Sequence, residues 1–436
     1  MLGESVGHSK GKFLLLLVSL VVASCAPKSK TDEANGDVAV QIATPTSATE
    51  YSVQVVTLKG IKNLKEVAGA FVKFFYAPGA NEQGLTGSAP RAHFTKASSF
   101  FVPTDLVSMQ MATIYFHMQN LAELDIFVGA GGINTWPRSV GVETQIDGNY
   151  YMSRNNAFYN GQTDAMMFVP FTLGDLPISL NAGIIAHEHF HSLFYKLVIK
   201  PAVAKNIPIT NSASIHAETA TTDDKVIKIQ SQLSEDERAH YFNDTLLRGQ
   251  NEGLADFWGW LYTSDANFIR WSLPSVESDR TLTLSESDVG DYFTKEKLNE
   301  AVTNSQAKRN PENYLASFAY YIGTSHARFL KQLTTLQVDE KSMTLPQAQK
   351  AMGGVVVQYL KSLSKNVLSV QGADTLETRD FFNYFAQALQ RSESGLKLNE
   401  KNCAFLIKYL NKESSASQKK VCSAGEGGQV TIQGAL

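Results

Sequence analysis

The sequence predicts an α+β protein with a mixed α/β N-terminal lobe, a mainly helical C-terminal lobe and a cleft between them. Residues 51–58 alternate polar and apolar side chains, as a half-buried strand does. Apolar side chains instead recur at helical spacing in residues 104–123, with an N-cap expected at Thr104 or Asp105, and again from about Leu315 onward. The length of 436 residues exceeds what one hydrophobic core usually supports, so at least two packed lobes are expected.

The charge balance argues against one broad class of function. The chain has a formal net charge of −3, with 43% hydrophobic and 19% charged residues, which is close to the average for globular proteins. It has no basic stripe and no motif of stacking aromatic residues, so the sequence does not support nucleic-acid binding. We therefore expect a folded protein with other kinds of partner.

The first residues predict an export signal. Basic residues precede an apolar run at residues 13–22 that is too short to cross a bilayer as a mature helix, so residues 1–24 are assigned to a signal peptide. Its last residues and the next, Val-Ala-Ser-Cys, resemble a bacterial lipobox, which implies that Cys25 is acylated and anchors the protein in the cell envelope. In a Gram-negative host, Ala26 after this cysteine implies the outer membrane. An ordinary signal peptide cleaved near Ala23 or Ala26 is the alternative.

The segments that follow are predicted from composition and pattern. Residues 25–50 are rich in Lys, Ser, Thr, Asp and Ala without periodicity, and we expect them to form a flexible tether. The N-terminal α/β lobe is assigned to residues 51–180. Within it, residues 66–75 and 125–128 resemble further buried or half-buried segments.

The C-terminal lobe is assigned to residues 266–436. We expect it to be mainly helical, with interruptions at the Gly-Gly pair 353–354 and the polar stretch 411–420. After export Cys403 and Cys422 would meet an oxidising compartment, so a disulfide between them is expected. A closed loop of this size stabilises a fold by about 3 kcal/mol in the chain-entropy model.

The strongest chemical signal lies in residues 181–265, which we expect to form zinc-site helices with an inserted segment. His187 and His191 are four residues apart, so on a helix both imidazoles can face one metal ion while Glu188 stands beside it as a base. His189 is two positions from each of these histidines and points to another face. We therefore expect His189 to pack or to form hydrogen bonds and not to bind the metal.

Two carboxylates complete this predicted site. Glu252 and Asp256 are also four residues apart, on an apolar segment that predicts a mostly buried helix. Burying both without compensation is costly, so a cation or a histidine partner is the simplest explanation. A catalytic zinc ion takes three protein ligands and keeps one position open for water, and His187, His191 and Glu252 would supply the three. Asp256 would then accept the remaining ring N–H of a ligand histidine.

Together these motifs resemble the gluzincin clan of zinc metallopeptidases, in which HExxH is followed by a glutamate ligand in an NExxxD helix. Asn251, Glu252 and Asp256 match that second motif at each defined position, and the resemblance covers about residues 102–262. It implies a zincin-like metallopeptidase fold with one Zn²⁺ per chain. It also implies that Asn251 and Asp256 lie around the metal ligands without binding the metal.

A third segment agrees with this resemblance. Asn156 and Ala157 begin an Asn-Ala-Phe-Tyr run similar to the edge strand that binds the substrate backbone in thermolysin-like and neprilysin-like enzymes. This similarity implies a peptide or protein substrate that adds to the strand in an extended conformation. A sheet edge of no catalytic importance is the alternative.

Two features depart from thermolysin-like enzymes. The separation between His191 and Glu252 is nearer to that of neprilysin-like enzymes, which leaves the family open and allows for an inserted subdomain or flap. Gly183 and Thr263 stand where thermolysin-like enzymes carry acidic calcium ligands, so calcium at that double site is not expected.

The expected activity is hydrolysis of peptide bonds by zinc-activated water, with Glu188 as the general base. A further donor should stabilise the oxyanion, and Tyr314 and His326 are the candidates, although either can equally be a packing residue. Two alternatives remain open: a non-proteolytic, zinc-binding surface lipoprotein, and an HExxH hydrolase that acts on a cell-wall bond. Glu188 argues against a purely structural zinc, which has no use for a base.

Overall fold

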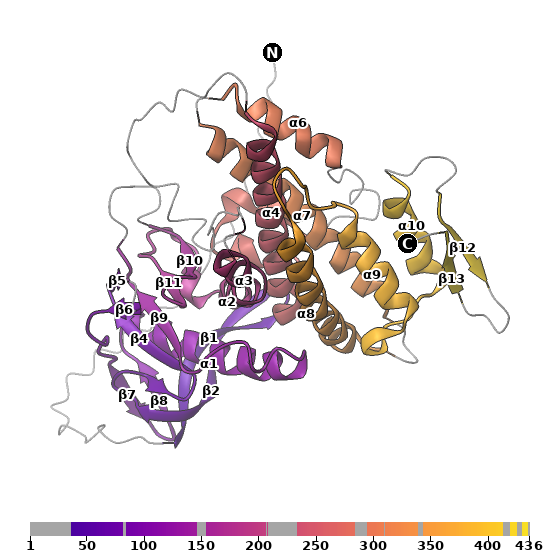
Figure 1. Ribbon diagram of the computed structural model, residues 1–436. Coiled ribbons are helices and arrows are strands. Elements are labelled where there is room, and N and C mark those ends of the chain that lie inside the picture. The colour runs from indigo at the N-terminus through magenta and orange to yellow at the C-terminus, as the bar shows by residue number, and fades with distance from the viewer. Residues whose placement is uncertain are drawn as a thin grey trace, which may run out of the picture.

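The structure of the protein is a computed structural model that describes residues 36–434, apart from 82–83, 146–153, 206, 208–232, 284–293, 309, 339–342, 413–418 and 425–429. It has an α+β architecture, as the sequence predicts, with a mixed sheet region in the N-terminal part of the chain and a largely helical C-terminal part (Figure 1). The predicted signal peptide, Cys25 and most of the predicted insertion lie outside the described residues.

The first sheet has five strands in the order β3-β2-β1-β8-β7. Its two long strands, β1 and β2, pair antiparallel with Val40 opposite Val56, and β8 joins β1 in parallel. Helix α1 (Leu106–Phe127) packs against β1 and β2. The strands are β1 (Gly36–Ser47), β2 (Glu50–Asn63), β3 (Ala68–Gly69), β7 (Phe94–Ala97) and β8 (Phe100–Pro103).

Strand β1 corrects the prediction of a flexible tether at residues 25–50. Val38, Val40 and Ile42 are buried at alternate positions, and the strand pairs with β2 along most of its length. The burial of every second side chain offsets the conformational entropy that a tether would retain. The tether prediction is therefore wrong from residue 36 onward, and residues 25–35 lie outside the described residues.

The second sheet has the order β10-β11-β9-β4. Strands β4, β9 and β11 run parallel, and β10 pairs antiparallel with β11 at the edge, so one side of β10 carries no other strand in the described part of the chain. An edge strand is what the sequence predicts after Asn156. The strands are β4 (Val72–Tyr76), β9 (Arg138–Val142), β10 (Ala157–Asn160) and β11 (Ala165–Phe168), and a separate hairpin joins β5 (Gly79–Asn81) to β6 (Gly84–Thr86).

Helix α1 begins where the sequence predicts and ends later. The side chain of its N-cap, Asp105, accepts a hydrogen bond from the backbone N–H of Ser108. The helix continues to Phe127 and so includes most of the predicted buried segment at residues 125–128. In its last turn Asp125 is buried, but Ile126 and Phe127 are 72% and 63% exposed, so the prediction of burial is wrong for these two residues.

The helical part is organised around α4 (Glu235–Thr263), which packs against both α2 (Ala182–Phe194) and α7 (Pro311–Thr335) (Figure 1). A π-helical turn (Tyr195–Ile199) and α3 (Lys200–Ala204) follow α2 directly. The other helices are α5 (Glu277–Arg280), α6 (Lys295–Ser305), α8 (Leu345–Ser369), α9 (Asp380–Gln390) and α10 (Glu400–Leu410), with 3-10 turns at Ile178–Leu180, Phe268–Trp271, Pro274–Val276 and Glu393–Gly395.

The Gly-Gly pair at 353–354 does not interrupt the helical pattern. Helix α8 runs through both residues, contrary to the prediction from sequence. A Cβ added at Gly353 would lie 3.0 Å from Val128 Cγ1 and 3.1 Å from Leu261 Cδ1. This glycine therefore allows α8 to pack closely against its neighbours, a reason that periodicity along one segment does not reveal.

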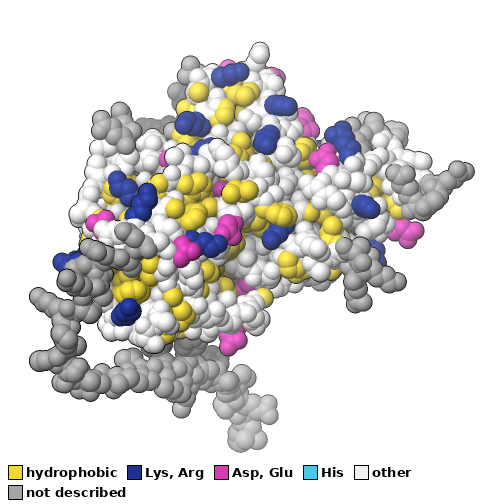
Figure 2. Space-filling view, turned by 90° about the horizontal axis from the view of Figure 1, so that it is seen from below, with side chains coloured by type: hydrophobic (Ala, Val, Ile, Leu, Met, Phe, Trp, Pro, Cys, Tyr) yellow, Lys and Arg dark blue, Asp and Glu magenta, His cyan; other side chains and the backbone are white. Residues whose placement is uncertain are grey.

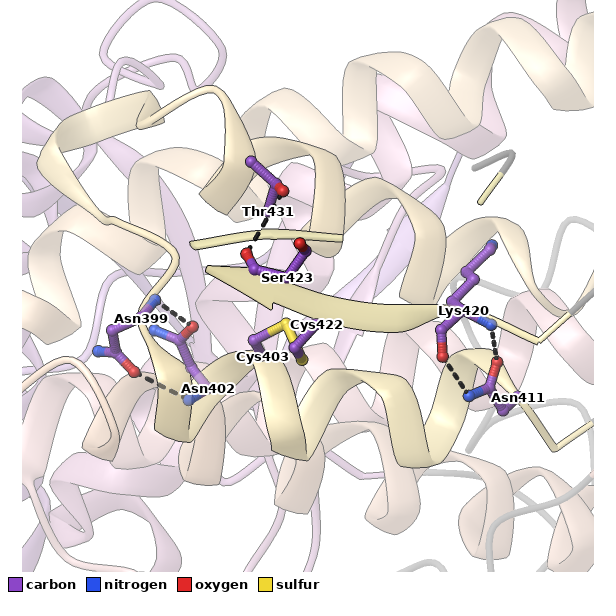
Figure 3. The surroundings of a disulfide bond; sticks show 8 residues. All are labelled: Asn399, Asn402, Cys403, Asn411, Lys420, Cys422, Ser423 and Thr431. Carbon is purple, nitrogen blue, oxygen red and sulfur yellow. Dashed lines mark hydrogen bonds between the residues drawn. A yellow bond between two sulfur atoms is a disulfide. The ribbon is translucent and has the colours of Figure 1, made fainter. Parts of the chain in front are cut away.

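A disulfide joins Cys403 in α10 to Cys422 in β12 (Val421–Ala424), as the sequence predicts, with the Cα atoms 6.0 Å apart (Figure 3). Strand β12 pairs with β13 (Val430–Gln433), so the bond ties a small hairpin to the last helix. Helix α10 ends before the predicted polar interruption. The Asn411 side chain there accepts a hydrogen bond from Lys420 N–H and donates one to the carbonyl oxygen of the same residue.

The surface in Figure 2 carries both signs of charge. Lys and Arg side chains are interspersed with Asp and Glu side chains, and apolar side chains lie between them on this face. This mixture agrees with the small formal net charge of −3.

Candidate metal centre

Two polar side chains fix the N-terminus of α2, the helix that carries the HExxH motif. The side chain of the N-cap, Asn181, accepts hydrogen bonds from the backbone N–H groups of Gly183 and Ile184. The backbone N–H of Ala182 donates to the Tyr51 hydroxyl of β2 at 2.9 Å. Every residue of α2 is buried, so the helix is held inside the molecule between the sheet region and α4.

Glycines set the position of α4, which carries the second motif. A Cβ at Gly253 would collide with the backbone of Gly323 in α7, and one at Gly249 would lie 2.6 Å from Ile322 Cβ. On another face of α4, a Cβ at Gly259 would overlap the ring of Phe268. These close contacts hold the turn that bears Glu252 between its neighbours.

The structure brings His187, His191 and Glu252 together in one buried group. The His187 Nε2 and His191 Nε2 atoms are 3.0 Å apart, and Glu252 Oε2 and Oε1 lie 3.6 Å and 3.9 Å from them, respectively. Two ligand atoms of a tetrahedral zinc ion are roughly 3.3 Å apart when the bonds are about 2.0–2.1 Å long. Among the described residues this is the one group of at least three His, Cys, Asp or Glu side chains that could hold a metal ion.

The second ring nitrogen of each histidine also has a partner. His187 Nδ1 lies 2.9 Å from Asp256 Oδ1, and His191 Nδ1 lies 2.9 Å from Asn251 Oδ1. These contacts direct Nε2 of both rings toward Glu252, as hydrogen bonds to the outer nitrogen do in metal sites. Asp256 and Asn251 therefore contact the ring nitrogens that point away from the group.

Arg280 is the residue of this centre that sequence reasoning missed. Its Nε and Nη2 atoms lie 3.1 Å and 2.5 Å from the two oxygens of Asp256, and Nη2 lies 3.9 Å from Glu252 Oε2. Burial alone would raise the pKa of Asp256, but Arg280 and His187 outweigh it and hold that pKa below its ordinary value. The sequence requires a cation or histidine here but does not show which arginine supplies the charge, because α5 is separated from α4 in the chain.

The carboxyl of Glu188 is buried beside the group. Burial raises its pKa to about 7; the charge of His187 opposes this rise, and the charge of Glu252 adds to it. The backbone N–H of Tyr159 in β10 also favours the ionised form of Glu188. Oε2 of Glu188 has no hydrogen-bond partner among the described residues. A buried carboxyl with a pKa near neutrality can exchange protons at physiological pH.

His189 faces away from the metal group, as helical geometry predicts. Its Nε2 atom lies 3.0 Å from Asp125 Oδ1, and both side chains are almost completely buried. The ring of Trp136 stacks on it with centroids 6.1 Å apart. His189 is therefore a hydrogen-bonding and packing residue in the interior.

The predicted substrate strand lies next to α2. Ala157 is the first residue of β10, and the side chain of Asn156 accepts a hydrogen bond from its backbone N–H. The effect of Tyr159 N–H on Glu188 places the middle of this strand beside the motif helix. Ala157 therefore begins the edge strand that packs against α2, and Asn156 directly precedes it.

The structure places neither predicted oxyanion donor at the metal group. Tyr314, in the first turn of α7, lies under Lys308 Nζ at 5.0 Å from its ring. His326 is completely buried and stacks on Phe381 with centroids 3.9 Å apart. These contacts agree with the alternative that the sequence leaves open, in which both side chains are packing residues.

Another tyrosine of α7, Tyr320, lies close to the charged side chains of the metal group. Burial, together with the nearby charge of Glu252, raises its pKa above the ordinary value and keeps the hydroxyl protonated. The Arg280 guanidinium lies 5.2 Å from its ring centre. The sequence signal for it is weak, since Tyr314, Tyr320 and Tyr321 all lie on the same predicted helix.

Comparison with known proteins identifies no family and no relative for this chain: no protein-family model matches it, and no curated protein is found to be related to it. The buried group of two histidines and a glutamate is therefore the finding on which a functional assignment depends.

Replacing one ligand tests this geometry. We expect Glu252→Ala to lower bound zinc far below one ion per chain, because only two ligands remain. His189→Ala should keep about one zinc per chain and should lower the free energy of unfolding by about 1–3 kcal/mol, because one oxygen of the buried Asp125 loses its partner. Metal analysis and thermal unfolding of both variants check these outcomes. Loss of zinc from the His189 variant with retention in the Glu252 variant would exclude the assigned ligand set.

The metal-free protein should show a defined pH dependence. Burial lowers the pKa of His187, but Asp256 and Glu252 outweigh burial and raise it to about 9 from 6.5. Protonated His187 therefore contributes fully to the free energy of unfolding below pH 6.5, and this contribution is lost as pH rises through 9. For this group it amounts to roughly 3 kcal/mol. We expect the Tm of the chelator-treated protein to fall over this interval, and to fall much less in His187→Gln. A constant or rising Tm in the treated wild type would contradict this assignment.

Proposed function

We propose that the protein is a zinc-dependent metallopeptidase of the gluzincin type, with a zincin-like fold, that hydrolyses peptide bonds with Glu188 as the general base. The observation that carries this proposal is the position of Glu188. Its carboxyl is buried beside the group formed by His187, His191 and Glu252, and Oε2 has no hydrogen-bond partner among the described residues. This atom is free to take a proton from a water molecule.

The ligand set favours catalysis over a structural metal. A structural zinc site closes all four positions with protein ligands, whereas this group offers three among the residues that the structure describes. A surface lipoprotein that kept zinc only for stability would gain nothing from Glu188. Its buried carboxyl, with a pKa raised to about 7, would instead cost stability in the ionised form.

Each residue around the metal group has its own role in the proposed reaction. A zinc ion held by the three ligands would supply Lewis acidity and lower the pKa of water at the site. Glu188 accepts the proton of the attacking water at Oε2 and passes it to the leaving amine. Asp256 and Asn251 hold the two imidazoles in place, and Arg280 keeps Asp256 ionised.

Tyr320 takes the role of oxyanion donor in this proposal, in place of Tyr314 and His326. Its hydroxyl stays protonated because its pKa lies above the ordinary value, and its ring lies beside Arg280 at the metal group. A protonated hydroxyl close to the reacting carbonyl stabilises the negative charge that develops there.

The position of β10 supports a peptide substrate over a cell-wall bond. Strand β10 is an edge strand, and an extended peptide can add to its unpaired side by backbone hydrogen bonds. Tyr159 N–H, in the middle of this strand, is close enough to Glu188 to affect its pKa. A peptide paired there would lie next to the base.

We further propose that the protein is a lipoprotein of the bacterial cell envelope, in the outer membrane if the host is Gram-negative. Among the described residues, no helix is long and apolar enough to cross a membrane. Cys25 lies only 11 residues before β1 begins at Gly36, so a lipid there would hold the folded part close to a bilayer. The lipobox-like residues before Cys25 support this assignment.

Mass spectrometry of the membrane-extracted protein tests the anchor. We expect an acylated N-terminus at Cys25, and we expect Cys25→Ser to abolish both the modification and membrane association. A free N-terminus at another residue would exclude the lipoprotein proposal.

Replacing the base tests the activity. Glu188→Gln keeps the size of the side chain and removes its basicity, so zinc content and Tm should stay near those of the wild type. We expect turnover to fall by roughly 10²- to 10⁴-fold. The measurement is zinc per chain and initial rates on the best substrate from an unbiased peptide library, with and without a zinc chelator.

The matched control is Glu235→Gln, at an exposed residue in the first turn of α4, which should keep full activity. Full activity of Glu188→Gln would exclude Glu188 as the base. If the wild type cleaves cell-wall fragments and no peptide, the substrate class is wrong; if it cleaves neither, the protein is a zinc-binding protein.

A further inference from the structure

A charged cluster lies on the side of α2 that faces away from the metal group. Its first centre is Asp164, in the turn between β10 and β11. The Asp164 carboxylate accepts a hydrogen bond from the Tyr159 hydroxyl at 2.8 Å and lies 2.9 Å from Arg138 Nη1 and 2.7 Å from Lys196 Nζ. Its backbone has a φ of 50°, a left-handed conformation that aspartate tolerates better than most residues. One carboxylate therefore joins β9, β10 and the π-helical turn that follows α2.

The second centre of the cluster is Asn134. Its Oδ1 atom accepts hydrogen bonds from Arg138 Nη1 at 3.0 Å, Ser192 Oγ at 3.0 Å and Lys196 Nζ at 3.2 Å. Its Nδ2 atom donates to Asp125 Oδ2 at 3.2 Å.

The other oxygen of Asp125 lies 3.0 Å from His189 Nε2. A continuous chain of polar contacts therefore runs from Tyr159 in the edge strand to His189 in the middle of the HExxH motif, by way of Asp164, Arg138, Asn134 and Asp125.

The cluster contains equal numbers of basic and acidic side chains, so each member depends on the others for charge compensation. Arg138 and Lys196 carry two positive charges, and Asp125 and Asp164 carry two negative ones. The Arg138 side chain is completely buried, and that of Lys196 is 14% exposed. The Asp164 side chain is 37% exposed, but its loss would leave the buried Arg138 and the mostly buried Lys196 without this partner, so moving strand and helix apart is unfavourable.

Tyr159 connects this cluster to the reacting side of α2. Its hydroxyl is held by Asp164, and its backbone N–H acts on Glu188. Among the described residues β10 pairs with one strand only, so its distance from α2 needs a second constraint. The cluster supplies that constraint, because the partners of Asp164 lie both in the sheet and directly after α2.

We propose that Asp164 is a positioning residue for substrate binding, which, through Tyr159, Arg138 and Lys196, fixes edge strand β10 relative to the HExxH helix. The inference rests on the proposed function: an extended peptide pairs with β10 beside α2, and so binds tightly, only if this distance is held. Asp164 itself touches neither the peptide nor the metal.

The test compares two single-atom deletions in the zinc-loaded, full-length protein. Tyr159→Phe removes the hydroxyl that Asp164 holds and keeps the buried ring. Tyr115→Phe is the matched control, since it removes a buried hydroxyl that donates to the Lys59 carbonyl at 2.7 Å on α1, away from β10. We expect Tyr159→Phe to raise KM about five- to tenfold, the loss expected for one hydrogen bond, with kcat and zinc content within twofold of the wild type. Tyr115→Phe should leave KM unchanged.

A merely structural role predicts a different pattern. Partial unfolding lowers kcat and zinc per chain together and leaves KM unchanged, and that result for Tyr159→Phe would overturn the inference. Equal KM changes in the two variants would overturn it as well. Asp164→Asn should raise KM at least as much as Tyr159→Phe, but it also leaves two cations uncompensated, so Tyr159→Phe decides the case if that variant does not fold.

Amide hydrogen exchange keeps the test independent of activity. We expect residues 157–160 to exchange at least fivefold faster in Tyr159→Phe than in the wild type, and to be unchanged in Tyr115→Phe. If the wild type cleaves no peptide, the proposed function fails, and exchange at these residues still decides whether the cluster positions β10. Unchanged exchange in Tyr159→Phe would overturn the inference.

Discussion

The compensation of two buried carboxylates is the interaction on which the rest of the metal centre depends. Glu252 and Asp256 lie one helical turn apart on α4, and both are almost completely buried. Such groups stay ionised in the interior only if cations or hydrogen-bond donors face them. The histidines of α2 face them from one segment, and Arg280 of α5 faces them from another. The fold must therefore bring two separate segments to one turn of α4, and the architecture around that turn serves this requirement.

Close packing between helices makes this convergence possible. Helices α4 and α7 meet where Gly253 faces Gly323, so their backbones approach without an intervening side chain. Phe268 fills the space that side chains at Gly183 and Gly259 would occupy. Because these contacts leave little room for adjustment, the carboxylates of α4 keep a fixed distance from the imidazoles of α2.

Helix α2 separates two polar groups that differ in their chemistry. His187 and His191 face a group with more carboxylates than permanent cations, which suits a metal ion. On its other side, His189 and Ser192 join a cluster in which carboxylates and cations are equal in number. Helical geometry alone produces this division, since residues two apart in a helix point to different faces. The excess of carboxylates in the first group favours binding of a further cation. The second group holds β10 and α2 together without one.

The sequence by itself determined the features that depend on local spacing. Residues four apart on a helix share a face, so the pairing of His187 with His191, and of Glu252 with Asp256, follows from their spacing alone. The disulfide partners followed from the presence of only two cysteines beyond Cys25. The tertiary structure alone decided which distant residues meet: Arg280 beside Asp256, Tyr320 beside Arg280, and the cluster of Asp164, Arg138 and Lys196. It also decided that residues 36–47 form a strand and that α8 continues through Gly353. These features depend on charge compensation, close packing and strand pairing between residues that are far apart in the chain. The spacing of residues within one segment therefore cannot predict them.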